Sequence, residues 1–111
     1  MQVVLITGAR APIALEMSRS FAKHGHTVIM ADSQRFTIAR WSNTVKKYYL
    51  LPSARYNTEG YINTINDIIK KENVAHLIPT CEEAFYVALH KDKINCRVWT
   101  SDKELMHDLH S

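Results

Sequence analysis

The residues whose types can do chemistry lie in two short segments, each of which follows an apolar run of the chain. The first segment is a glycine turn that leads into a helix, and the second leads into another helix. Helix starts present unpaired N–H groups and a positive dipole end, which attract anionic ligands. An arginine there can bind a carboxylate or phosphate, and a glutamate can accept a hydrogen bond from an amine or hydroxyl. The candidate substrate-binding residues are Gly8, Ala9, Arg10, Thr80, Glu82 and Glu83.

Each candidate also has a purely structural interpretation, and the residues alone leave both interpretations open. Thr80 and Glu83 have the spacing of a capping box, so Glu83 can serve only to accept a backbone N–H. Glu82, in the first turn of the same helix, can simply complement the helix dipole. Arg10 can be a solvated loop residue, and Gly8 can be required only for its backbone conformation.

The hydrophobic pattern predicts one α/β domain in which strands alternate with helices. The predicted strands are residues 2–7, 26–31, 47–51, 75–80 and 97–100. The predicted helices are residues 12–24, a stretch around 61–71, a stretch from the capping box through residue 89, a final helix from residue 101, and a short helical piece near 37–42. Right-handed crossovers favour a three-layer α/β/α, Rossmann-like fold with a mainly parallel sheet of about five strands in the order 3-2-1-4-5.

This strand order makes the first and fourth strands neighbours. In open parallel sheets, ligands bind beyond the carboxyl ends of the strands, at the point where the strand order reverses. We therefore expect residues 8–10 to face residues 80–83 across one crevice.

Gly8, Ala11 and Ala14 occupy the three positions of a GxxGxxG turn, a pattern that raises the alternative of a dinucleotide site. Asp32 ends the second strand, where an acid that binds ribose is expected. Two of the three glycines are missing, however, and Pro12 follows the middle position. These departures argue against dinucleotide binding and favour a role for Asp32 in capping the following turn.

The composition excludes several function classes. The chain has 111 residues, of which 46% are hydrophobic, enough for a single core. The formal net charge is +3, but the basic residues are spread along the chain, so nucleic acid is not an expected partner. Neither Cys81 and Cys96 nor the six histidines form a metal-binding pattern, and no catalytic, metal-binding or cofactor-binding residue is assigned. No apolar run can span a bilayer and no signal peptide is evident, so a cytoplasmic location is expected.

Several stretches, in their order and spacing, resemble the N-terminal (pre-ATP-grasp) domain of ATP-grasp enzymes, in the branch similar to the carbamoyl-phosphate synthase large subunit. The resemblance rests on residues 4–10 with Pro12, 25–28, 31–33, 40–42 with Tyr49 and 51–53, 78–83 and 101–110. It implies a Rossmann-like domain at residues 1–100. It also implies that residues 101–111 begin a helix leading into an ATP-grasp domain that this chain lacks.

The resemblance further implies the substrate-side domain of an ATP-dependent carboxylate–amine or ammonia ligase, inactive by itself. ATP and magnesium would bind in the missing lobes, leaving this chain without a cofactor of its own. The crevice would then border a small-molecule acceptor substrate, with Arg10 as the anchor for an anionic group. The expected partners are that substrate and the missing lobes, and a homodimer is left open.

Two other functions remain open from the sequence. One is a small NAD(P)-binding Rossmann domain of a reductase or epimerase. The other is a stand-alone regulatory domain that binds a small anion in the same crevice.

Overall fold

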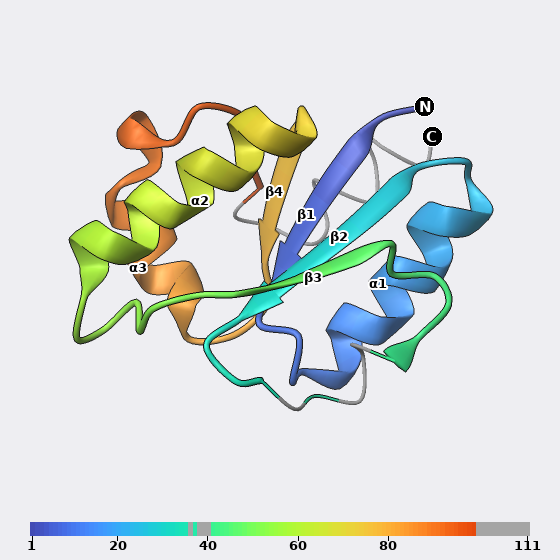
Figure 1. Ribbon diagram of the computed structural model, residues 1–111, viewed down its shortest axis with the longest axis horizontal. Coiled ribbons are helices and arrows are strands. Elements are labelled where there is room, and N and C mark those ends of the chain that lie inside the picture. Colours follow the sequence, from blue (N-terminus) through green and yellow to red (C-terminus); the bar gives the residue numbers. More distant parts are fainter. Residues whose placement is uncertain (36, 38–40, 100–111) are drawn as a thin grey trace.

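One parallel sheet organises the chain in the computed structural model, which describes residues 1–35, 37 and 41–99 (Figure 1). The strands are hydrogen-bonded in the order β3-β2-β1-β4-β5. Their bounds are β1 (Val3–Thr7), β2 (Thr27–Asp32), β3 (Lys47–Leu50), β4 (His76–Pro79) and β5 (Arg97–Val98). The helices are α1 (Pro12–Lys23), α2 (Thr58–Glu72), α3 (Glu83–Leu89) and the short 3-10 helix η2 (Lys91–Lys93).

The predicted α/β fold and the predicted strand order are confirmed. The differences lie at the ends of elements. β2 extends one residue further than expected, because Asp32 pairs with Leu50 of β3 and its carbonyl accepts a hydrogen bond from the N–H of Leu51 at 2.9 Å. β5 ends at Val98 within the described residues. The predicted helix from residue 101 lies outside the described residues, as does most of the helical piece predicted near 37–42.

Alternate residues of the central strands face opposite helical layers, as the period of two in a strand requires. Val4 and Ile6 of β1 pack with Met17 and Phe21 of α1 on one face of the sheet. Leu5 points to the other face, where α2 and α3 cover the sheet. Figure 1 shows α1 on one side of the sheet and α2 on the other. Thr7 has the parity of Leu5, so it lies under α2 and α3.

The bounds of α2 follow from its end residues. At its start the side chain of Asn57 accepts a hydrogen bond from the N–H of Gly60 at 3.1 Å, which satisfies one of the free donors of the first turn. At its end Asn73 adopts the left-handed conformation (φ 57°), a common helix terminator. Between them an apolar stripe faces the sheet, formed by Tyr61, Ile62, Ile65, Ile68 and Ile69.

Within residues 1–35, 37 and 41–99, none of the helices combines the length and the apolar character that crossing a bilayer demands.

Candidate functional site

The turn after β1 is shaped by Gly8, whose φ of +77° lies in the left-handed region that favours glycine. The N–H of Ala11 donates to the carbonyl of Gly8 at 2.9 Å, and α1 begins at the next residue, Pro12. Proline suits this position because its ring fixes a helical φ, but it contributes no N–H to the helix start. The turn therefore offers fewer backbone donors to a ligand than a glycine-rich turn does.

Side chains of the protein itself fill the space beside Gly8 that a larger residue would occupy. A Cβ atom placed on Gly8 would lie 2.6 Å from Oγ1 of Thr80 and 2.8 Å from Oε2 of Glu83. Thr80 donates to the carbonyls of Thr7 (2.7 Å) and Gly8 (3.1 Å), so its hydroxyl joins the ends of β1 and β4. The first and fourth strands thus share one packed junction at their carboxyl ends.

Glu83 is the centre of this junction, and it is only 7% exposed. Its Oε2 atom accepts three hydrogen bonds: from the hydroxyl of Thr7 at 2.8 Å and from the N–H groups of Thr80 at 3.1 Å and Cys81 at 3.2 Å. The bond from Thr80 is half of the predicted capping box. The other half is absent, because the Thr80 hydroxyl bonds to β1 and the residue before α3, Glu82, makes no side-chain cap.

Arg10 crosses the opening between β2 and α3. Its backbone N–H donates to Oδ2 of Asp32 at 3.2 Å, and its Nε lies 3.8 Å from the same oxygen. Its Nη2 lies 3.3 Å from Oε1 of Glu82, whose side chain is 83% exposed. Burial by itself lowers the pKa of Arg10, but the neighbouring charge of Asp32 and the contact with Cys81 outweigh it and raise the pKa. The Asp32 partner is buried, whereas the Glu82 partner is a surface contact.

Asp32 also performs the capping role expected from the sequence, since its Oδ1 accepts the N–H of Ser33 at 2.6 Å. Its two carboxylate oxygens are therefore divided between the next turn and Arg10. The carboxylate lies at the carboxyl end of β2, beside the turn after β1.

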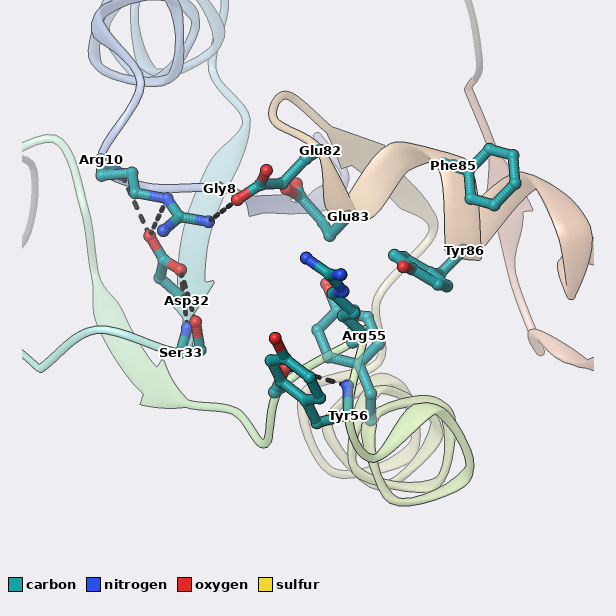
Figure 2. Close-up of a pocket in the computed structure, with 13 residues that line it drawn as sticks. Gly8, Arg10, Asp32, Ser33, Arg55, Tyr56, Glu82, Glu83, Phe85 and Tyr86 are labelled. Carbon is teal, nitrogen blue, oxygen red and sulfur yellow. Dashed lines mark hydrogen bonds and ion pairs between the residues drawn. The ribbon is translucent and has the colours of Figure 1, made fainter.

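A pocket of about 550 Å³ opens above these residues. Figure 2 shows Arg10 and Asp32 on one side of it, with α3 and the loop after β3 on the other. The lining residues are Gly8, Arg10, Asp32, Ser33, Ser53, Ala54, Arg55, Tyr56, Tyr61, Glu82, Glu83, Phe85 and Tyr86.

The far wall of the pocket is aromatic and basic. Phe85 and Tyr86 of α3 meet edge to face, with ring centroids 5.3 Å apart. In the loop after β3, the guanidinium of Arg55 lies over the ring of Tyr56, 5.2 Å from its centroid. Figure 2 shows the side chain of Arg55 extending toward the space between Glu83 and Tyr86. Two arginines from different loops thus reach one cavity.

Four of the six residues singled out from the sequence line this pocket: Gly8, Arg10, Glu82 and Glu83. Ala9 is buried in the core against α1, and Thr80 joins the two strands without lining the pocket. The sequence interpretation missed Arg55, Tyr56 and Tyr61. The strand order held a signal for the first two, because the loop after β3 ends at the same edge of the sheet.

Other titratable groups lie apart from the pocket. Over residues 1–35, 37 and 41–99, no cluster of three His, Cys, Asp or Glu side chains can hold a metal ion.

At the amino edge of the sheet, the indole N–H of Trp99 donates to Nδ1 of His76 at 2.9 Å. Nε2 of His76 therefore carries the proton and donates to Oε1 of Gln2 at 2.7 Å. Burial, and then the charge of Arg97, lower the pKa of His76. Burial raises the pKa of Cys96 to about 11, which disfavours a reactive thiolate there.

The comparisons with known proteins give a fold and no family. No family model matches the chain, and no curated protein matches it. Among solved structures, the chain is similar to dTDP-glucose 4,6-dehydratase from Bacillus anthracis, solved in complex with NAD, with a TM-score of 0.60 and 10% identity. The match covers 88% of this chain and 36% of that protein, so the chain spans about a third of its length.

This likeness overturns the resemblance to ATP-grasp enzymes and to the carbamoyl-phosphate synthase large subunit. The matching structure named above is an NAD-bound dehydratase and not a ligase, and no family model or curated protein supports the ligase. The stretches that suggested the ligase are apolar strands followed by glycine or threonine turns, which parallel sheets of many functions share. The comparisons therefore support a Rossmann-like domain, and they correct the expected ATP-grasp ligase function.

Proposed function

We propose that this chain is a nucleotide-binding Rossmann-like domain that binds NAD or NADP, the class of cofactor used by reductases and epimerases. The observation that carries the proposal is the position of Asp32. Its carboxylate ends β2 and lines a pocket at the carboxyl edge of the sheet, where an acid can accept hydrogen bonds from ribose hydroxyls. The likeness to the NAD-bound dehydratase supports the same reading of the fold.

The residues of the pocket fit the adenosine half of such a cofactor. Asp32 and Ser33 offer polar contacts to the ribose, and Tyr56 and Tyr86 offer ring faces for the base. Arg10 is paired with Asp32, so the free 2′-hydroxyl of NAD suits this site better than the 2′-phosphate of NADP, which would bring like charge against the Asp32 carboxylate.

The pyrophosphate needs a different kind of support here. Because Pro12 lacks an N–H and the N–H of Ala11 is bonded to the carbonyl of Gly8, the backbone of the turn cannot supply the usual set of donors. Arg10 and Arg55 line the same pocket, so side-chain charge can neutralise the phosphates instead. Bound NAD(P) supplies hydride transfer, while the role derived for these residues is to bind and orient it.

The test is calorimetric titration of NAD⁺ and NADP⁺ into the wild-type protein, Asp32→Ala and Arg10→Ala. Arg19→Ala, at an exposed position on α1, is the matched control for loss of one arginine. We expect Asp32→Ala to weaken binding of NAD⁺ about tenfold and binding of NADP⁺ less, and Arg10→Ala to weaken both cofactors through loss of a phosphate contact. The proposal is refuted if folded wild-type protein binds neither NAD⁺ nor NADP⁺.

A stand-alone domain that binds a small anion is the second candidate. The observation that favours it is the presence of Arg10 and Arg55 in a pocket whose turn lacks the second and third glycines. Titration with inorganic phosphate separates the two functions, since this candidate requires phosphate to bind at least as well as either dinucleotide.

A further inference from the structure

Two buried polar atoms beneath the pocket have no hydrogen-bond partner within residues 1–35, 37 and 41–99: Oε1 of Glu83 and the phenol oxygen of Tyr61. Glu83 is 7% exposed and Tyr61 is 2% exposed, and both residues line the pocket. More than nine in ten buried polar groups in proteins have a partner. Two polar atoms without hydrogen-bond partners in one pocket are therefore unusual and require an explanation.

The two residues come from different helices, and both lie near Thr7 at the end of β1. Tyr61 belongs to the apolar stripe of α2, and Glu83 begins α3. Burial raises the pKa of Tyr61, and the charge of Glu83 raises it further, as expected for neighbouring groups. The hydroxyl of Thr7 donates to Oε2 of Glu83 at 2.8 Å, and its interaction with the phenol partly offsets the rise in the pKa of Tyr61.

The pattern of bonds on Glu83 divides the carboxylate into two halves. Oε2 accepts all three hydrogen bonds that hold the strand junction together, so the position of the side chain is fixed. Oε1 accepts none, and a buried acceptor without a donor destabilises the protein because it has lost its hydrogen bonds to water. A donor that reaches Oε1 thus meets a preorganised partner.

The chemistry of that donor follows from having a phenol beside a carboxylate. A hydroxyl group donates to Oε1 while it accepts from the phenol of Tyr61, so a single group satisfies both atoms. An ammonium group can only donate, which leaves the phenol hydrogen without an acceptor. A phosphate brings like charge against the carboxylate. The pair therefore selects a neutral hydroxyl.

We infer that Glu83 and Tyr61 form a subsite that binds a hydroxyl of the second ribose of a dinucleotide. The inference rests on the proposed function, which places the first ribose at Asp32. Glu83 lies over the turn at Gly8, beside the junction of β1 and β4, whereas Asp32 ends β2 on the other side of the turn. One pocket with two acidic acceptors suits a ligand with two sugars.

The test compares ligands with one and two sugars. ADP has one ribose, whereas ADP-ribose has two and lacks nicotinamide. Titrations of both are made on wild-type protein, Tyr61→Phe and Glu83→Gln. In Glu83→Gln the amide oxygen can keep the three bonds of Oε2, while the amide NH₂ replaces the acceptor at Oε1 with a donor.

We expect both variants to lose about tenfold in affinity for ADP-ribose and less than twofold for ADP. The matched controls are Tyr49→Phe and Glu72→Gln, which remove the same groups from a pair on β3 and α2 outside the pocket. If Glu83→Gln fails to fold, Tyr61→Phe alone decides the result.

Each outcome separates the inference from the proposed function. Equal losses for ADP and ADP-ribose would assign the pair to the ADP part that the two ligands share, and no loss in Tyr61→Phe would mean that the phenol makes no contact with the ligand; either result overturns the subsite. Wild-type binding of ADP and of NAD⁺ in those cases leaves the proposed function standing. Failure of wild-type protein to bind any of these nucleotides overturns both.

Discussion

Two phenol–carboxylate pairs in this protein have the same chemistry and opposite circumstances. The edge pair is Tyr49 and Glu72, between β3 and α2, and the pocket pair is Tyr61 and Glu83. In the edge pair the phenol donates directly to Glu72, and Lys47 donates to the same oxygen at 2.9 Å. In the pocket pair the phenol and Oε1 of Glu83 have no partner among the residues that the structure describes.

The comparison shows what distinguishes a structural polar pair from one available to a ligand. The hydrogen bond to Glu72 raises the pKa of Tyr49 to about 12, and the same bond, with help from Lys47, lowers the pKa of Glu72. Each member of the edge pair thus stabilises the other. In the pocket pair, packing holds Tyr61 and the hydrogen bonds of Oε2 hold Glu83. The phenol and Oε1 therefore remain able to form hydrogen bonds with a ligand.

The largest expected effect concerns the glycine that makes room for Glu83. Gly8→Ala places a Cβ within 3 Å of Thr80 and Glu83 at a φ of +77°, and we expect it to lower the free energy of unfolding by about 4 kcal/mol. Gly25→Ala is the control, since Gly25 also has a positive φ but no atom within 4 Å of such a Cβ. It should cost only about 1 kcal/mol. Urea unfolding measures both, and equal losses would contradict the close packing of Glu83 on the turn.

A smaller effect, of opposite sign in the two pairs, follows from removing one phenol oxygen. Tyr61→Phe deletes a buried hydroxyl that lacks a partner, so we expect unfolding to cost about 1 kcal/mol more. Tyr49→Phe deletes a hydroxyl that donates to Glu72, so we expect the protein to lose about 1 kcal/mol. Thermal unfolding without ligand decides this, and a destabilised Tyr61→Phe would mean that the hydroxyl has a partner after all.

The smallest effect is a dependence on pH that belongs to the edge pair. The hydrogen bond from Tyr49, followed by that from Lys47, lowers the pKa of Glu72 below its ordinary value of 4.5. The unfolded chain therefore binds a proton at a higher pH than the folded chain. The contribution to stability is present above about pH 4.5 and is lost as pH falls through the lowered pKa. Melting temperatures between about pH 6 and pH 3 should fall less steeply in Glu72→Gln than in wild-type protein.

The sequence predicted the scaffold better than the site, and the reasons are physical. Strand order and helix positions follow from apolar periodicity and the handedness of crossovers, which are local or general rules. Arg55 and Tyr56 escaped notice because their place depends on how a loop leaves β3. Tyr61 was recognised only as part of an apolar stripe, since nothing in the periodicity of a helix says whether a buried phenol has a partner.

The resemblance to ATP-grasp enzymes failed for a related reason. It rested on strand ends and turns, which report the architecture of a parallel sheet rather than its ligand. The reading of Glu83 as a cap was half right, because one carboxylate oxygen does accept the N–H of Thr80. The other oxygen, Oε1, has no hydrogen-bond partner among the described residues, and this is evident only from the positions of α2 and α3 in the structure.

At the edge of the sheet away from the pocket, one imidazole joins the residue before β1 to the residue after β5. His76 receives the indole proton of Trp99 on one nitrogen and gives its own proton to Gln2 with the other. Loss of either contact would leave one nitrogen of this buried ring without a partner. We therefore expect detachment of Gln2 and detachment of Trp99 from the sheet to be coupled through His76.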